Sequence, residues 1–374
     1  MLRILGKQTS LFVIVMMLAV NVAALSAQDA VCDVSASESV AFIADIDGNY
    51  EIYTINLDGS CIQNLTSNPF DDLAPSWSPN GQILAFISTR SNPQGDVYIR
   101  TGEIDIRVTN NGATNIAPIA WSPDSRYFAF VSTQNHAQGD IFIYDVLNNS
   151  LSNITNDANP DFSPNWSSHG SEIVFVSGNS SASLMPYVFN FTTGERSRLL
   201  DSEEATWFPA WSPSGNYIGY FTISSSDGIY LFDTATANIE QLLVESSASP
   251  PMSWSPRNLE VAFAAGSVEG YRIYVVDLLN HLIAELPTRN RYAISPAWAP
   301  SGRYIAFFSQ GQHARSSLCL FDYSTHQSVV LADQILVFSS EVDPFLLQSS
   351  PISWRAHPQP EHLIANSTDS FAIC

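Results

Sequence analysis

The sequence predicts an all-β protein, a β-propeller of four-stranded blades. Three observations lead to this fold class: a tryptophan-centred phrase recurs at a fixed period, four strand-like segments fill each period, and the two ends of the chain complement each other. The anchoring tryptophans are Trp77, Trp121, Trp166, Trp211, Trp254 and Trp298, spaced by 44, 45, 45, 43 and 44 residues. A period in the forties with four strands in each repeat is typical of propeller blades.

The first unit of the repeat is incomplete. It contains three strand-like segments, Val40–Asp45, Glu51–Asn56 and Cys61–Thr66, but no tryptophan strand precedes them. Short apolar segments bounded by turn residues predict strands. We therefore expect this unit to take its fourth strand from elsewhere in the chain.

The recurring phrase predicts two strands joined by a tight turn. In its first complete copy Trp77 lies on one strand, Ser78 to Gly81 reads Ser-Pro-Asn-Gly, and Phe86 lies on the next strand. Proline presets φ at the second position of a type I turn, and glycine suits the fourth. The tryptophan, and the aromatic residue nine positions after it, are suited to packing between neighbouring sheets.

Each period continues with a third, apolar strand and a fourth, more polar one. Asp140–Asp145 and Ser150–Thr155 are one such pair, and Arg272–Asp277 and Leu282–Leu286 are another. No long helical pattern follows residue 27. Each period therefore supplies the four strands of one blade.

The chain finishes with an unmatched tryptophan strand, Ile352–Pro358. Its pairing with the first unit would close the ring and remove exposed sheet edges. Six complete units and this composite give seven blades as the expected number, with six or eight as alternatives. The longer spacing between Trp298 and Trp354 predicts an insertion or an irregular unit between Asp333 and Ser350.

The predicted organisation has four parts. Residues 1–27 are expected to form a secretory signal peptide, because a positively charged start precedes a short apolar run and small residues. Residues 28–39 form an N-terminal arm, 40–358 the propeller and 359–374 a C-terminal tail. We expect a secreted or periplasmic protein cleaved near Ala27, with no membrane span, since the apolar run is short for one.

Charge and cysteine content restrict the partners and the compartment. The formal net charge is −21, and no lysine occurs after Lys7. Such a surface repels nucleic acid and anionic lipid, so no nucleic-acid partner is expected. The four cysteines allow three pairings in an exported protein. We favour Cys32 with Cys61, which leaves Cys319 with Cys374.

The Trp-Ser-Pro turn, the Ile-Ala-Phe strand after it and the Ile-Tyr-x-x-Asp strand resemble the TolB-like β-propeller family. The resemblance runs from about Val40 to His357 and rests on six phrases in phase. TolB itself is a periplasmic protein of the envelope-spanning Tol system, and it binds a peptidoglycan-associated lipoprotein. The resemblance implies a similar location for this chain. We expect this sequence to depart from TolB in having seven blades, where TolB has six, and no α/β domain before them, since about a dozen residues separate Ala27 from the first blade.

No other pattern predicts a catalytic or metal site, and we expect no cofactor. Propellers of this kind precede the hydrolase domain of prolyl-oligopeptidase-like peptidases, but no Gly-x-Ser-x-Gly nucleophile motif occurs. The segment Asp45–Glu51 resembles part of a calcium loop. Its glycine is the fourth residue and a strand follows at once, so a hairpin turn explains it better. The seven histidines are not spaced as metal ligands.

The candidate binding residues lie on one face of the predicted propeller. Loops that enter the tryptophan strands, and loops between the second and third strands, share this face. The candidates are Trp207, Phe162, Asp72, Asp161, Glu204 and Tyr292. An aromatic and acidic rim around the channel mouth suits binding of a protein segment or a sugar. The alternative is that Trp207 and Phe162 pack between blades.

We therefore expect an exported, non-catalytic propeller, monomeric, that binds or scaffolds another envelope or extracellular protein. The alternative is a propeller hydrolase or lyase acting on glycans, chemistry that uses two carboxyl groups roughly 5 to 10 Å apart. Convergent carboxylates at the channel mouth favour the enzyme, and an apolar rim favours the binding protein.

Overall fold

The computed structural model is all-β over the residues it describes. These are 38–180, 183–200, 205–222, 228–244, 247–257, 259–267, 270–288, 290, 292–310, 315–337, 351–356 and 374. The predicted signal peptide, almost all of the arm and the tail, Cys32 and Glu204 lie outside them. Within the described ranges, 28 strands and no α-helix are present.

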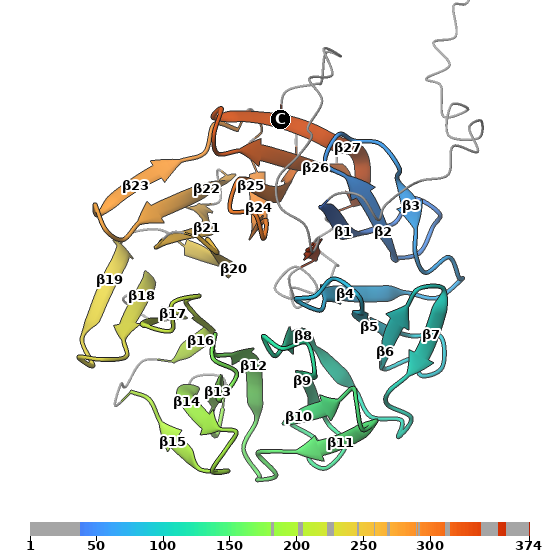
Figure 1. Cartoon of the computed structure of the whole chain (residues 1–374), viewed down its shortest axis with the longest axis vertical. Helices are drawn as coiled ribbons and strands as arrows, with labels where there is room; N and C mark the ends of the chain where they lie inside the picture. Colours follow the sequence, from blue (N-terminus) through green and yellow to red (C-terminus); the bar gives the residue numbers. More distant parts are fainter. Residues whose placement is uncertain are drawn as a thin grey trace, which may run out of the picture. The chain divides into compact units, whose positions relative to one another are not determined.

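The strands group into seven sets of four, called blades 1 to 7 below (Figure 1). Blade 1 contains β28 (Ile352–Arg355), β1 (Ser39–Ala44), β2 (Glu51–Asn56) and β3 (Gln63–Asn64). Blade 2 contains β4 (Asp72–Trp77), β5 (Leu84–Ser88), β6 (Asp96–Thr101) and β7 (Ile104–Arg107). Blade 3 contains β8 (Asn115–Trp121), β9 (Tyr127–Ser132), β10 (Asp140–Asp145) and β11 (Ser150–Asn153). Blade 4 contains β12 (Asp161–Trp166), β13 (Glu172–Ser177), β14 (Met185–Asn190) and β15 (Arg196–Arg198).

The remaining three blades follow the same order. Blade 5 contains β16 (Thr206–Trp211), β17 (Tyr217–Thr222), β18 (Gly228–Asp233) and β19 (Ile239–Val244). Blade 6 contains β20 (Ser247–Trp254), β21 (Glu260–Ser267), β22 (Gly270–Asp277) and β23 (Leu282–Glu285). Blade 7 contains β24 (Tyr292–Trp298), β25 (Tyr304–Gln310), β26 (Arg315–Asp322) and β27 (Gln327–Val337). A parallel bridge between Tyr271 and Tyr292 joins blades 6 and 7 into one eight-stranded sheet, which the repeat did not predict.

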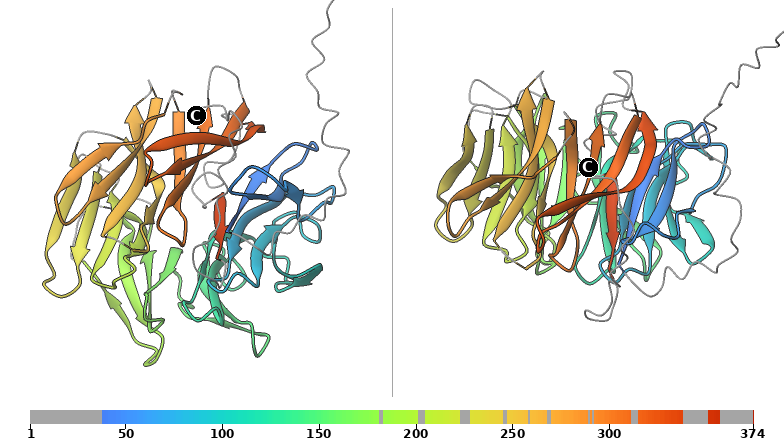
Figure 2. Two further views of the ribbon diagram at one scale, coloured as in Figure 1. Left: turned by 45° about the horizontal axis from the view of Figure 1, so that its top comes forward. Right: turned by 90° about the horizontal axis from the view of Figure 1, so that it is seen from above.

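The two terminal strands pair as the sequence predicts. β28 runs antiparallel to β1, with Val40 opposite Trp354 and Ala41 opposite Ser353. The innermost strands β28, β4, β8, β12, β16, β20 and β24 contact one another in that order around a central axis (Figures 1 and 2). β1 therefore has a hydrogen-bonded neighbour on each side.

The recurring phrase forms the predicted turn. Gly81 N donates to Ser78 O at 2.8 Å, and Gly215 N donates to Ser212 O at 2.9 Å. Gly81 has φ +68°, and a Cβ there would lie 2.2 Å from Ala356 O, so only glycine fits. Each of the six repeated tryptophans is the last residue of its innermost strand, for example Trp211 in β16.

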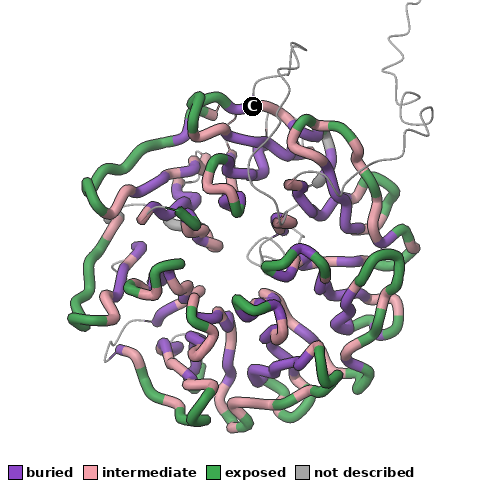
Figure 3. The backbone as a smooth tube through the Cα atoms, in the orientation of Figure 1, coloured by how far each residue is buried: buried purple, intermediate pink, exposed green. Residues whose placement is uncertain are grey.

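The core lies between the sheets, where the second and third strands of the blades are the most buried (Figure 3). Phe86, Phe130 and Phe175 are fully buried, and each packs against an aromatic ring of the third strand. The outermost strands are more exposed; every residue of β23 is exposed. Burial of the paired rings between adjacent sheets holds each blade against the next.

A disulfide joins Cys319 of β26 to Cys374, with Cα atoms 6.1 Å apart. This is one of the two pairings that we expected. The other, Cys32 with Cys61, involves a residue outside the described part of the chain and stays a prediction. The irregular unit expected between Asp333 and Ser350 falls partly on β27, which shows register shifts; residues 338–350 are not described.

Candidate functional site: the central channel and its mouth

A proline lies two or three residues before the tryptophan of every innermost strand. The prolines are Pro75, Pro118, Pro164, Pro209, Pro251, Pro296 and Pro351. In six of the seven strands the register with the neighbouring strand shifts at this point, for example between Leu73 and Ser76. Proline lacks an N–H group, so within a sheet it is confined to edges and bulges.

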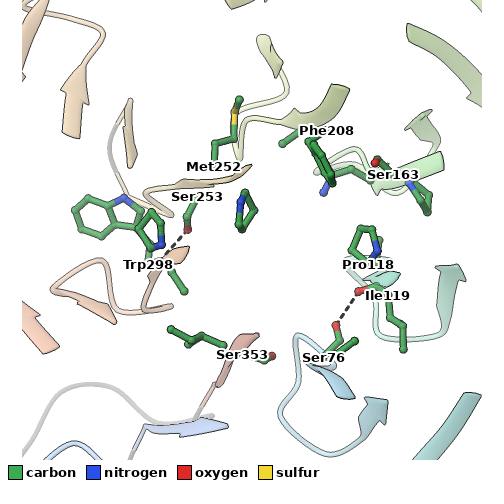
Figure 4. Close-up of a pocket in the computed structure, with 18 of the residues that line it drawn as sticks. Ser76, Pro118, Ile119, Ser163, Phe208, Met252, Ser253, Trp298 and Ser353 are labelled. Carbon is green, nitrogen blue, oxygen red and sulfur yellow. Dashed lines mark hydrogen bonds between the residues drawn. The ribbon is translucent and has the colours of Figure 1, made fainter. Parts of the chain in front are cut away.

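These bulges line a channel on the central axis, with a cavity volume of about 330 Å³ (Figure 4). Its walls are prolines, small side chains and a few apolar ones, including Ile119, Phe208 and Met252. None of the described residues that line the channel is charged. The channel can therefore hold an uncharged or apolar group, or accept the tip of an apolar loop.

Two recurring kinds of hydrogen bond join neighbouring innermost strands around this channel, and Ser76 Oγ of β4 also donates to Ile119 O of β8 at 2.9 Å (Figure 4). In the first kind, an indole Nε1 donates to a carbonyl oxygen of the preceding inner strand. The pairs are Trp121 to Ser76 at 2.9 Å, Trp254 to Ala210 at 3.2 Å and Trp354 to Ala297 at 2.9 Å. We call these contacts indole latches.

In the second kind, the tryptophan backbone N donates to a side chain of the preceding inner strand. The pairs are Trp77 to Ser353 Oγ at 2.8 Å, Trp211 to Asn165 Oδ1 at 2.9 Å and Trp298 to Ser253 Oγ at 2.9 Å. We call these contacts side-chain latches; the last is drawn in Figure 4. Several polar side chains of the channel wall thus join blades.

The predicted carboxylates Asp72 and Asp161 lie at the expected end of their strands but are fully buried. Asp72 accepts from Arg90 Nη2 at 3.1 Å, and Asp161 lies 3.7 Å from Arg196 Nη2. Burial raises the pKa of Asp72, although Ser88 and Arg90 oppose the shift. Burial likewise raises the pKa of Asp161 to about 6. Neither residue lines the channel.

The predicted aromatic residues are half-buried at the same end. Trp207 packs against a core cluster shared by blades 5 and 6, and its ring centroid lies 6.3 Å from that of Phe208, which lines the channel. Phe162 packs against the core between blades 3 and 4. Tyr292 begins β24 and pairs with Gln310. Their binding role stays a prediction, as does that of Glu204.

Sequence reasoning missed the residues that line the channel. The available signal was the proline two or three positions before each tryptophan, which recurs in all seven inner strands. Among the described residues, no group of three or more acidic, histidine or cysteine side chains is arranged to hold a metal ion. The same residues include no helix of the length and apolar character that a membrane span requires.

Comparison with curated proteins finds relatives among TolB proteins. The Tol-Pal system protein TolB of Desulfosudis oleivorans is 40% identical over 80 residues, 21% of this chain and 18% of the relative. A TolB homologue of Chlorobium chlorochromatii is 31% identical over 142 residues, 37% of this chain and 31% of the relative. Dipeptidyl-peptidase 5 of Porphyromonas gingivalis is 23% identical over 69% of this chain and 40% of the relative. The chain thus spans well under half the length of these relatives, and no family model matches it.

Solved structures share the fold at low identity. TolB from Acinetobacter baumannii has a TM-score of 0.52 and 16% identity, over 85% of this chain and 66% of that one. An oligogalacturonate lyase in complex with manganese has a TM-score of 0.61 and 14% identity, over 75% of this chain and 85% of that one. The β-propeller domain of the Trilobed protease from Pyrococcus furiosus, described as having an open velcro topology, has a TM-score of 0.60 and 14% identity. The likeness covers 81% of this chain and 95% of that one.

The strand pairing and these likenesses define the class of protein as a β-propeller. Within that class, the chain is similar to TolB proteins, and these matches support a TolB-like β-propeller family. The resemblance read from the tryptophan phrase is thereby confirmed.

Proposed function

We propose that this chain is an exported, non-catalytic binding protein of the cell envelope or extracellular space. Its partner is another protein, engaged at the channel mouth where Trp207 and Phe208 lie. The observation that carries this proposal is the channel itself, whose described lining is uncharged and partly apolar. An apolar concave site framed by aromatic side chains is suited to anchoring a projecting protein segment. The TolB relatives and the Cys319–Cys374 disulfide support an envelope location.

The glycan-cleaving alternative would require two carboxyl groups facing one substrate. The predicted acids Asp72 and Asp161 do not supply such a pair, because each is buried beside its own arginine in a different blade. The fold likeness to a lyase, at 14% identity, concerns the fold alone. Binding therefore accounts for the channel better than hydrolysis or elimination does.

The test is capture of partners from envelope extracts of the source organism by the immobilised wild type and three variants. Trp207→Ala and Phe208→Ala should each reduce capture at least tenfold, since interface aromatics of this kind contribute about 2 kcal/mol or more. Leu147→Ala is the matched control, because Leu147 is 76% exposed in the turn between β10 and β11, at the other end of the blade. Urea unfolding of each variant separates lost binding from lost folding. Equal capture by all four proteins would contradict the proposal.

A further inference from the structure

Blades 2, 3 and 4 carry polar residues at equivalent register positions at the end of the sheet near the channel mouth, except that the third position in blade 4 is Met185. In blade 2, Asp72 pairs with Ser88, and Ser88 pairs with Asp96. In blade 3 the same register positions hold Asn115, Ser132 and Asp140. Residues directly opposite each other on neighbouring strands project from the same face of a sheet. Each set therefore forms one polar cluster above the stacked aromatic rings of its blade.

In blade 2 a guanidinium group occupies this cluster. Arg90 Nε donates to Ser88 Oγ at 2.8 Å, and its Nη2 lies 3.1 Å from Asp72 Oδ1. The Cζ atom of Arg90 stands 5.4 Å from the ring centroid of Phe86 and 4.8 Å from that of Tyr98. Buried carboxylate, hydroxyl and aromatic faces together stabilise the positive charge.

In blade 4 a guanidinium group reaches the same place from a different strand. Arg196 belongs to β15, yet its Nη2 donates to Ser177 Oγ at 2.5 Å and lies 3.7 Å from Asp161. Its Cζ atom stands 5.1 Å from the Phe175 ring and 4.2 Å from the Tyr187 ring. Two unrelated positions in the repeat thus deliver one positive charge to one kind of site.

Blade 3 has the site without the guanidinium. The position of Arg90, two residues after the paired serine, holds Gln134, which is exposed and accepts from Asn111. The position of Arg107, which pairs with Asp96 in blade 2, holds Asn153. The aromatic pair is kept as Phe130 and Phe142, with ring centroids 6.2 Å apart.

Three oxygen atoms in this cluster have no hydrogen-bond partner within the described chain. They are Asn115 Oδ1, Ser132 Oγ and Asp140 Oδ1. The three residues are only 4%, 0% and 0% exposed. The other oxygen of Asp140 accepts from His136 Nδ1 at 2.8 Å and from Asn153 Nδ2 at 2.7 Å. The side-chain amide nitrogen of Asn115 donates to Gly95 O at 2.7 Å. A buried carboxylate oxygen without a donor or cation is strongly unfavourable.

We propose that Asn115, Ser132 and Asp140 bind a monovalent metal cation of the potassium class at the seam between blades 2 and 3. The cation takes the place that a guanidinium occupies in blades 2 and 4. Its charge of one matches that group, and a weakly hydrated cation suits the aromatic faces below. Calcium takes six to eight oxygen ligands, usually with several carboxylates, whereas this cluster offers a single carboxylate.

The direct test is a crystal structure of the full chain grown in rubidium chloride, with rubidium as the probe for potassium. An anomalous peak within about 3 Å of Asn115 Oδ1, Ser132 Oγ and Asp140 Oδ1 is the expected result. A water molecule at that point, with no anomalous signal, would overturn the proposal. No mutation is needed, so folding defects do not affect this measurement.

Reciprocal substitutions test the same site in solution. The unfolding midpoint of the wild type should rise by roughly 2 to 4 °C when potassium chloride at about ten times its Kd replaces choline chloride at equal ionic strength. Gln134→Arg should remove this response by supplying an internal guanidinium. Arg90→Gln should enlarge it by creating a second site in blade 2. A wild-type unfolding midpoint that is the same in potassium chloride and in choline chloride would contradict the proposal.

Discussion

The seams between innermost strands fall into two kinds that alternate around the channel. Indole latches join β4 to β8, β16 to β20 and β24 to β28, and side-chain latches join β28 to β4, β12 to β16 and β20 to β24. An alternating pattern cannot close on a ring with an odd number of members. The seam between β8 and β12 breaks it: within the described residues neither latch is present, and Ala120 offers no side-chain acceptor.

The spacing between proline and tryptophan separates the two kinds of strand. Trp121, Trp254 and Trp354 follow their prolines by three residues, and their indoles form latches. In the other four strands the spacing is two, and the indole Nε1 atoms are buried without a partner among the described residues. These are the Nε1 atoms of Trp77, Trp166, Trp211 and Trp298. One extra residue in a bulge changes the bend of a strand and re-aims its side chains, which is enough to turn one latch into the other.

The largest expected effect comes from removing β28, the C-terminal strand that pairs with β1 and takes part in both kinds of latch. β28 donates an indole latch from Trp354 and accepts a side-chain latch at Ser353. Deletion of residues 351–374 should therefore lower the unfolding midpoint by more than about 10 °C and expose the edge of β1 to self-association. Calorimetry and size-exclusion chromatography measure the two effects.

Cys374→Ser is the control for this deletion, because the deletion also removes the disulfide partner of Cys319. This variant keeps β28 and should stay monomeric. A truncated chain that is monomeric and as stable as the full chain would show that the terminal pairing contributes nothing.

The next largest effect compares Asp161 and Asp145, two acidic residues whose pKa values shift in opposite directions on folding. Burial raises the pKa of Asp161 to about 6, so between about pH 4 and 6 the folded state keeps a proton that the unfolded state has released. The stability from that proton is fully present below pH 4 and lost as pH rises through 6. Asp161→Asn should therefore gain stability relative to the wild type at pH 7, on the order of 2 kcal/mol.

Asp145 provides the opposite case in the same experiment. Hydrogen bonding to Arg126 lowers the pKa of Asp145 to about 2, so its contribution is present above about pH 4 and lost toward pH 2. Asp145→Asn should destabilise the protein at pH 7 and have a much smaller effect near pH 2. Urea unfolding as a function of pH measures both variants; the same sign of effect at pH 7 would contradict the account.

Much of the fold can be predicted from the sequence because the same pattern of strands and turns recurs in each repeat. The period, the turn at Ser78 to Gly81 and the pairing of Val40–Asp45 with the terminal tryptophan strand are local patterns, and the structure contains each. The candidate site was harder to predict. Asp72 and Asp161 are acidic loop residues by sequence, but whether an arginine such as Arg90 or Arg196 covers them depends on packing between blades.

A smaller effect compares two buried tryptophans with different latches. Trp121 is 9% exposed and Trp166 is 6% exposed, but only Trp121 donates an indole hydrogen bond. Substitution by phenylalanine removes similar apolar area from both sites. Trp121→Phe should cost about 1 kcal/mol more than Trp166→Phe, because it leaves the carbonyl of Ser76 without its donor. Equal losses in urea unfolding would show that the two seams do not differ in energy.

The smallest predicted effect is a gain at the seam between β8 and β12, which has neither latch among the described residues. Ala120 holds the position that Ser353, Asn165 and Ser253 hold in the latched seams. Ala120→Ser would place a hydroxyl acceptor beside the backbone N of Trp166. We expect stabilisation by about 0.5 to 1 kcal/mol, measured against Ala210→Ser, where an indole latch already joins the strands. A larger gain in the Ala210 variant would be evidence against the assignment.

Hydrogen exchange of the backbone amides of Ile352–Arg355, followed by mass spectrometry on the unmodified full chain, tests the central claim most directly. That claim is that the two ends of the chain meet in one sheet and complete the ring around the channel. The account predicts that these amides exchange as slowly as those of β4, since both are inner strands of hydrogen-bonded sheets. Exchange at the rate of an unstructured peptide, with β4 still protected, would contradict it.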